Sequence, residues 1–378
     1  MKKILLATTA IVALSAVAAD ASAADKIKLS LGGFMKQYVG VANNDDVSAT
    51  ANSGTARAVN LQQWANNEIY FRGSTKLTNG LNVSVDHQME TSNRAVGSRR
   101  LDVSSLEISS DAVGALTVGS TTHAANDYTT RAPNVGPLDY GDMATALNSQ
   151  AATAAVASSA VVTTTGVQQD DLGGKGLKLK YVSPNFSGVN VFVSYAADAG
   201  NNGQIQQATN AATDTYSYGA AFGGEVGGAA LTADIIHSNL DTGFDQNHFG
   251  LTVGMAGFTV GGGYTTYNDT DTGGNLAATK QNADGKAIEV GVAYEAGPFG
   301  VSATYASVKT KGTSTATQDN KDTTWTVAGA YDLGAGVAIT GQYYKQKFDG
   351  EDVGTVATVA NGKSVSSSGV VAGIEVGF

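Results

Sequence analysis

Residues 67–90 of the chain read NEIYFRGSTKLTNGLNVSVDHQME, and this stretch decides the fold. Apolar or small side chains alternate with polar ones on both sides of the Asn79-Gly80 pair. An Asn-Gly pair between two alternating runs is the strongest short-range signal for a β-hairpin. The stretch therefore predicts two antiparallel strands, each with one apolar and one polar face. The predicted apolar face carries Ile69, Phe71, Gly73, Thr75, Leu77, Leu81, Val83, Val85 and Met89.

The same alternation recurs along most of the chain, for example at Leu177, Leu179 and Tyr181, which alternate with Lys178 and Lys180. Short connections are predicted near 79–80, 110–115, 183–188, 224–228, 255–257, 295–300 and 332–336. Longer polar connections are predicted near 41–60, 92–100, 122–175, 198–213, 239–246, 268–284, 310–322 and 348–366. Short and long connections alternate strictly. With a first strand at 27–40 and a last strand at 367–378, they predict sixteen strands and place both termini beside the short turns.

The last ten residues, GVVAGIEVGF (369–378), indicate what these strands build. Phe378, Val376 and Ile374 share an apolar face, although chain ends are usually polar and frayed. A soluble sandwich would not alternate short and long loops so regularly. A bilayer tolerates no unpaired sheet edge, and its barrels carry aromatic girdles. We therefore predict a closed transmembrane barrel in which the last strand pairs with the first. Its girdles would contain Tyr38, Tyr181, Tyr195, Tyr294, Phe299, Tyr331 and Phe378.

The amino terminus predicts export. Residues 1–23 combine Lys2 and Lys3, a short apolar run and Ala21-Ser22-Ala23, the pattern of a cleaved signal peptide. The barrel domain is then 24–378. The signal contains two lysines and one aspartate, so the totals of 23 basic and 33 acidic residues become a net charge of −11. Such a surplus argues against a nucleic-acid partner. The absence of cysteine excludes thiol nucleophiles and zinc-thiolate sites.

The stretches ADKIKLSLGGFMKQYVG (24–40), LKYVSPNFSGVNVFVSY (179–195) and the terminal IEVGF resemble the trimeric, sixteen-stranded general porins of Gram-negative bacteria. This resemblance covers the whole chain after the signal. It implies a homotrimer of water-filled barrels in the bacterial outer membrane, in contact with lipopolysaccharide, through which small hydrophilic solutes and ions diffuse. In the family, the outer-membrane assembly machinery reads the terminal aromatic strand, which here would involve Phe378, Val376 and Ile374.

The third long connection, 122–175, is by far the longest, and a structureless loop of that length is usually functional. In the family this loop folds into the barrel and places acidic residues opposite basic ones on the wall. The resemblance assigns the acidic constriction to Asp127, Asp139 and Asp142, without choosing among them. The aspartates, set against few wall bases, predict mild cation selectivity.

Strand parity places the opposing bases. A lipid-facing lysine or arginine near mid-bilayer costs about 2–4 kcal/mol, so these side chains should face the lumen. Arg72 and Lys178 are the first candidates, followed by Lys36 and Lys180. Lys76 and Arg99 complete the predicted pore lining.

Other functions have weaker support. The four histidines lack metal-ligand spacing, and the chain has no nucleophile elbow, P-loop or dinucleotide fingerprint, so we expect neither an enzyme nor a cofactor. Asp269 and Asp271 are candidates for a loosely bound Ca²⁺, although the bidentate glutamate of a calcium loop is missing. A general diffusion porin is therefore the favoured function. A substrate-specific channel of the same fold and a non-conducting structural barrel are the alternatives.

Overall fold

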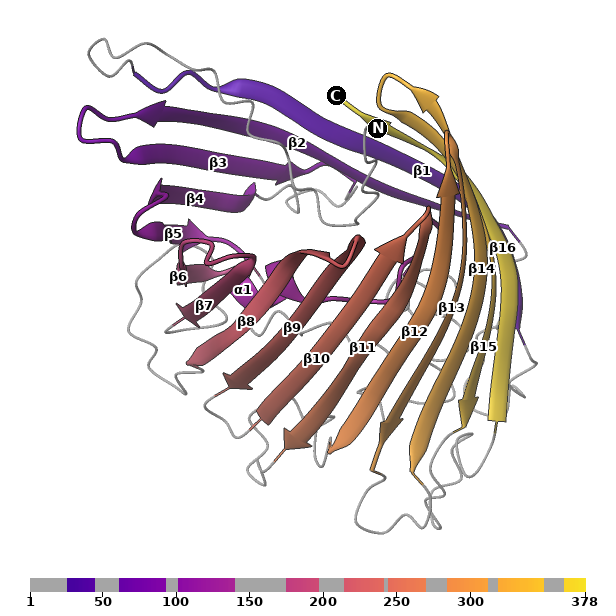
Figure 1. The fold of residues 1–378 in the computed structure, drawn as a ribbon. Coiled ribbons are helices and arrows are strands. Elements are labelled where there is room, and N and C mark those ends of the chain that lie inside the picture. The colour runs from indigo at the N-terminus through magenta and orange to yellow at the C-terminus, as the bar shows by residue number, and fades with distance from the viewer. Residues whose placement is uncertain are drawn as a thin grey trace, which may run out of the picture.

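Sixteen antiparallel strands form one closed barrel, as predicted (Figure 1). The computed structural model describes residues 26–44, 61–92, 101–139, 175–196, 214–240, 244–269, 284–311, 319–349 and 364–378. The strands are β1 (Ser30–Asn44), β2 (Gln62–Lys76), β3 (Asn82–Glu90), β4 (Leu101–Ser110), β5 (Gly114–Ser120), β6 (Leu177–Val182), β7 (Val189–Ala196), β8 (Thr215–Val226), β9 (Ala229–Leu240), β10 (Phe244–Met255), β11 (Phe258–Asp269), β12 (Gly285–Ala296), β13 (Phe299–Thr310), β14 (Asn320–Gly334), β15 (Val337–Asp349) and β16 (Ser364–Gly377).

The last strand closes the barrel on the first, which confirms the prediction from the carboxyl terminus. In this register Val376 lies beside Met35, and Ile374 lies beside Gln37. The Gly33 amide donates to the Phe378 carbonyl at 2.8 Å, and the Phe378 amide donates to the Gly33 carbonyl at 3.1 Å. Phe378 therefore ends a paired strand, and its side chain is exposed.

All seven predicted short turns occur, and they lie at one end of the barrel. At Ala256-Gly257 both residues have positive φ, of 53° and 84°, and Ala335-Gly336 repeats this with 52° and 79°. Positive φ at both central residues matches the right-handed twist of the flanking strands, and glycine adopts it without steric cost. The other eight connections join the strands at the opposite end. One of them, residues 241–243 between β9 and β10, is as short as the turns, so the predicted strict alternation of short and long connections is wrong there.

The two faces of the strands differ as the alternation predicts. Phe71 is 37% exposed on the outer face of β2, whereas Tyr70 is 7% exposed on the inner face. The outer face is built mainly from exposed apolar side chains such as Leu251, Val253 and Ile374. This face suits lipid, because every strand edge is paired and most of its exposed large side chains are apolar.

One predicted girdle residue is wrong. Tyr38 is 1% exposed and shares the inner face of β1 with Lys36, so its ring does not reach the membrane interface. Parity decides its position, because an even-numbered residue of β1 points inward whatever its aromatic character. The first strand also begins at Ser30 and ends at Asn44 instead of spanning 27–40.

The wall of the barrel has a short side. Strands β3–β7 contain 6 to 10 residues, whereas the other strands contain 12 to 15. One short helix, α1 (Ala124–Tyr128), follows β5. Among the described residues, no helix is long and apolar enough to cross a membrane. The predicted signal peptide, Arg99, Asp142 and Asp271 lie outside the described residues.

Candidate functional site on the inner face

The described part of the third long connection, residues 121–139, lies against the inner face of the strands. At its start, the Ala124 amide donates to Ser194 Oγ on β7 at 2.7 Å, and His123 Nε2 lies 2.9 Å from Thr215 Oγ1 on β8. Ala124 and Ala125 of α1 are buried in one apolar cluster with Phe192 and Ile236. The Tyr128 ring stacks on the Phe192 ring at 4.7 Å. The helix therefore covers the inner faces of β7 and β9.

Asp127 of α1 faces the basic residues of β6. Its Oδ2 accepts from Lys180 Nζ at 2.8 Å, and its Oδ1 accepts from Thr122 Oγ1 at 3.0 Å. The Lys180 side chain is 13% exposed and the Asp127 side chain 39%, so water reaches this ion pair. This contact joins an acidic residue of the connection to a basic residue of the wall.

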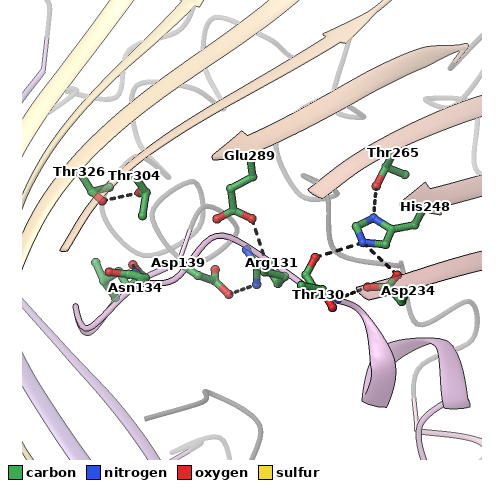
Figure 2. A network of polar contacts seen from close by, with 11 residues as sticks. Thr130, Arg131, Asn134, Asp139, Asp234, His248, Thr265, Glu289, Thr304 and Thr326 are labelled. Carbon is green, nitrogen blue, oxygen red and sulfur yellow. Dashed lines mark hydrogen bonds and ion pairs between the residues drawn. The ribbon is translucent and has the colours of Figure 1, made fainter. Parts of the chain in front are cut away.

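Thr130 is held by one side chain from β9 and one from β10, and a threonine of β11 supports the latter (Figure 2). Its amide donates to Asp234 Oδ2 at 2.8 Å, and its carbonyl lies 3.1 Å from His248 Nε2. His248 Nδ1 lies 2.8 Å from Thr265 Oγ1, and His248 Nε2 lies 3.4 Å from Asp234 Oδ1. Since the Thr130 carbonyl accepts only, Nε2 carries the proton and Nδ1 accepts from the threonine hydroxyl.

The wall has no side chains where the backbone of Thr130 approaches it most closely. A Cβ at Gly263 would lie 3.0 Å from the Thr130 carbonyl oxygen and 2.5 Å from His248 Cε1. A Cβ at Gly250, which pairs with Gly263 across β10 and β11, would lie 2.5 Å from Thr130 Cβ. The two glycines therefore allow the connection to pack directly on the strands.

Arg131 joins the connection to the acidic side of the wall. Its Nη1 lies 2.6 Å from Asp139 Oδ2 in the same connection, and its Nε lies 3.3 Å from Glu289 Oε2 on β12. The side chains of Arg131 and Glu289 are 20% and 7% exposed. Burial alone would lower the pKa of the Arg131 guanidinium, but Glu289 and Asp139 raise it above its ordinary value, so Arg131 stays a cation.

The connection then reaches the strands on the far side. The Val135 amide donates to Ser302 Oγ on β13 at 3.0 Å. The Leu138 amide donates to Gln342 Oε1 on β15, and Gln342 Nε2 donates to the Leu138 carbonyl, both at 3.0 Å. The Leu138 side chain is 1% exposed and packs against Tyr38 of β1, Tyr344 of β15 and Val371 of β16. Residues 121–139 thus run across the inner face from β6 and β7 to β15.

Comparison with known proteins identifies this barrel. The model of the Gram-negative porin family matches residues 7–351. The chain belongs to the Gram-negative porins. It is therefore a channel-forming protein of the bacterial outer membrane. None of the curated proteins compared with this porin matches it.

Solved structures of porins and of another outer membrane protein share the fold of this porin. The anion-selective porin from Comamonas acidovorans is 17% identical, with a TM-score of 0.59 over 93% of this chain and 100% of that chain. OmpT, an outer membrane protein of Vibrio cholerae, is 13% identical, with a TM-score of 0.59 over 94% of this chain and 98% of that chain. A mutant of the Rh. blastica porin is 15% identical, with a TM-score of 0.54 over 93% and 100%.

The described basic residues predicted to line the porin lie on the inner face, and two of them pair with acidic residues on neighbouring strands. Arg72 Nε lies 2.9 Å from Asp86 Oδ1 on β3, and its guanidinium lies over the Tyr70 ring. Lys36 Nζ lies 3.4 Å from Glu375 Oε2 on β16. Lys178 is 4% exposed, and its Nζ lies 3.5 Å from the Gly176 carbonyl. Lys76 is exposed beside the first short turn.

Of the predicted acidic residues, Asp127 faces a wall base, but Asp139 does not. Asp139 instead pairs with Arg131, which the sequence reasoning did not select, and Arg131 pairs with Glu289, which it also missed. Parity alone could have placed Asp234, His248 and Glu289 on the inner face. Nothing in the local pattern shows that residues 130 and 131 would meet them. For Asp269, only the backbone is described, at the end of β11.

Proposed function

We propose that this porin is a water-filled channel for the passive diffusion of small hydrophilic solutes and ions, with residues 121–139 forming its constriction. The observation that carries the proposal is the run of this connection across the inner face, from Lys180 on β6 to Gln342 on β15. A segment held inside a barrel narrows the path through it. Its exposed charges then act most strongly on a passing ion, because the low-dielectric walls focus their field.

The charges of the inner face support mild cation selectivity. Strands β1, β2 and β6 carry all the inward basic side chains of the described strands, which are Lys36, Arg72, Lys76, Lys178 and Lys180. The inward acidic side chains are more numerous and lie on both sides of the barrel: Glu68, Asp86, Glu90, Glu107, Glu225, Asp234, Glu289, Glu295, Asp322, Asp332 and Glu375. Such an excess attracts cations, and salt screens it beyond about 8 Å at physiological ionic strength.

The alternatives have less support. A substrate-specific channel of the same fold needs a ladder of aromatic or basic side chains, whereas the inner aromatic residues Tyr38, Phe192 and Tyr344 are buried. A non-conducting barrel would have no use for an inner face rich in charges.

We also propose that the protein is no enzyme. Among the described residues, no group of three His, Cys, Asp or Glu side chains could hold a metal ion, and Ca²⁺ binding at Asp269 and Asp271 stays a prediction.

We further propose that three barrels associate through the side of β1–β5. The outer face there carries the half-buried polar side chains Gln37, Asn67, His87, Ser104 and Ser120. Gln37 Nε2 donates to Asn67 Oδ1 at 3.0 Å. His87 Nδ1 is buried and has no hydrogen-bond partner among the described residues. Polar groups facing hydrocarbon cost several kcal/mol, so this side suits contact with protein. Three of the strands in this side, β3–β5, are also short.

The exposed terminal strand supports a role in assembly. Ile374 and Phe378 lie on the outer face and are 51% and 63% exposed. We propose that Phe378, Val376 and Ile374 are read by the outer-membrane assembly machinery before β16 pairs with β1, because an unpaired apolar strand is a ready binding site.

A zero-current potential in a planar bilayer tests the channel and its selectivity together. Under a KCl gradient we expect a potential of the sign for cation preference, decreasing as both salt concentrations rise. Changing Asp127, Asp139 and Asp142 together to asparagine should shift it toward anions, because the change also releases Lys180 and Arg131 from their partners. A barrel that inserts without conductance contradicts the channel. An unchanged potential in the triple variant contradicts the constriction.

A further inference from the structure

Two stacked aromatic rings lie on the inner face of β1 and β2. Trp64 of β2 is directly opposite Tyr38 of β1 in the strand register, so the two side chains share this face. Their ring centroids are 4.8 Å apart and their planes differ by 13°, which is a parallel stack. Tyr38 is buried, whereas Trp64 is partly exposed. The stack therefore presents the indole ring of Trp64 to the lumen.

The wall of the barrel holds this stack in place. On β16, Gly373 lies opposite Tyr38, and a Cβ at that position would overlap the Tyr38 ring. The Tyr38 hydroxyl donates to Glu375 Oε1 at 2.8 Å. Packing and this hydrogen bond fix the tyrosine ring, and the tyrosine ring supports Trp64. A ring that is already held in position loses little further freedom when a solute binds to it, which favours binding.

An ion pair adjoins the stack. Lys36 lies two residues from Tyr38 on the same face of β1, and its Nζ is 3.4 Å from Glu375 Oε2 on β16. Lys36 is a diagonal neighbour of Trp64, and such neighbours on paired strands are about 7–8 Å apart. The Lys36 and Glu375 side chains are 27% and 21% exposed, so a solute beside Trp64 can reach them. The pair has no net charge, but it offers a hydrogen-bond donor and an acceptor.

The stack lies beside the end of the proposed constriction. Leu138 belongs to one buried cluster with Tyr38 and Tyr344, and Trp64 packs against that cluster. Trp64 is also close to the start of β2 at Gln62, which is the end of the strand that adjoins a long connection. A solute that enters the barrel from that end therefore meets Trp64 next to residues 121–139.

We propose that Trp64, with Lys36 and Glu375 beside it, is a binding subsite for the ring of a neutral, polyhydroxylated solute such as a sugar. The inference rests on the proposed function, because it names a class of solute for that channel. The face of an indole ring is weakly negative and attracts the weakly positive C–H groups on the face of a sugar ring. The hydroxyl groups at the edge of a sugar both donate and accept hydrogen bonds, so they complement an ion pair that offers both.

A charged solute fits this subsite less well, because one member of the Lys36–Glu375 pair repels it whichever its sign. An organic cation is the strongest competitor, since cations also bind the faces of indole rings. The channel stays a general one. A single accessible ring is one subsite, whereas a substrate-specific channel needs a continuous ladder of them.

The first experiment measures the tryptophan fluorescence of the folded porin in detergent while maltotriose is added. The chain has two tryptophans, so a Trp325→Phe variant reports on Trp64 alone. Trp325 lies on the outer face and is 58% exposed, so its replacement leaves the subsite intact. We expect a saturating change in the Trp64 emission with maltotriose. Polyethylene glycol of the same mass, which has no ring and no hydroxyl groups along its chain, should cause none.

The second experiment records how maltotriose interrupts the ion current through single channels in a planar bilayer. Trp64→Leu keeps the apolar bulk and removes the aromatic face, so we expect it to shorten the mean residence time of maltotriose about fivefold. Trp64→Tyr keeps an aromatic face and should retain most of the residence time. The matched control, Trp325→Leu, should give the residence time of the parent.

Three outcomes would overturn the proposal: a Trp64 emission that does not respond to maltotriose, an unchanged residence time in the Trp64→Leu variant, or tighter binding of tetramethylammonium than of maltotriose. The conductance in KCl without sugar is recorded in the same membranes. A Trp64→Leu variant that conducts like the parent shows that the channel is intact, so loss of the subsite and failure of the channel are distinguished. If Trp64→Leu does not fold, the fluorescence of the Trp325→Phe variant decides alone.

Discussion

The inner faces of the two sides of the barrel carry different charges. On β1–β6 basic and acidic side chains lie together, and pairs such as Arg72 with Asp86 are within 2.9 Å. On β8–β16 the inward charges of the described strands are all acidic. Residues 121–139 complement both sides, because Asp127 meets Lys180 on β6 while Arg131 meets Glu289 on β12. The difference teaches that residues 121–139 are oriented by two ion pairs of opposite polarity, one with each side of the wall. The net negative field in the channel comes from the surplus of inward acidic residues over basic ones.

The largest expected effect comes from the acidic side. Changing Arg131 to alanine leaves Glu289, 7% exposed, and Asp139 without their cation. Removing one partner of a buried pair costs about 3 kcal/mol or more. We expect residues 121–139 to detach from the wall. This detachment should raise the single-channel conductance and make the connection accessible to protease. We also expect stronger cation selectivity, because a positive charge leaves the channel.

Glu289 provides the control for this variant. Changing Glu289 to glutamine together with Arg131 to alanine removes the uncompensated carboxylate from the wall, so the double variant should be less destabilised than the two single effects predict. The midpoint of thermal conversion to the unfolded gel form measures this. Strict additivity would mean that the two side chains do not interact.

An intermediate effect is expected where the connection touches the wall most closely. Alanine at Gly263 would place a Cβ 2.5 Å from His248 Cε1, and overpacking of this kind typically costs about 1–3 kcal/mol. The expected result is a noisier open-channel current, because Thr130 and His248 must shift. Gly329 is the matched control, since an alanine Cβ there has its nearest neighbour at 3.8 Å. Equal current noise in the two variants would show that close packing at Gly263 does not hold the connection.

The smallest effect is expected on the mixed side. Lys180 and Asp127 are partly exposed, and such pairs contribute about 0–1 kcal/mol to stability. Changing Lys180 to glutamine should leave thermal stability within error and shift the zero-current potential slightly toward cations at low salt. Changing Lys180 to arginine keeps the charge and should restore the parent potential. A loss of stability as large as that of the Arg131 variant would remove the distinction between the two sides.

Much of the fold could be predicted because alternation is a local property. The turn at Asn79-Gly80, the outward position of Phe71 and the pairing of the terminal strand all follow from period-two patterns and from the requirement that no edge faces lipid. Tyr38 shows where the prediction failed. Its aromatic character suggested the membrane interface, but its parity with Lys36 places it inside, against Leu138.

The candidate site was less predictable. Asp127 was selected and meets a wall base, whereas Arg131, Glu289, Asp234 and His248 were not selected. Parity places the last three on the inner face, but every strand has inward polar residues, so parity does not rank them. The signal that was available is the conjunction of Gly250 and Gly263 on neighbouring inward positions, which marks a place where another backbone approaches.

The sequence by itself determined the number of strands, the seven short turns at one end, the faces of the strands and the closure through Phe378, because each depends on residues close together in the chain or on the lack of water in a bilayer. Only the tertiary structure decided the path of residues 121–139. Thr130 meets His248 and Leu138 meets Gln342 across separations of 118 and 204 residues. Such contacts depend on the position of the whole wall, and no local pattern encodes them.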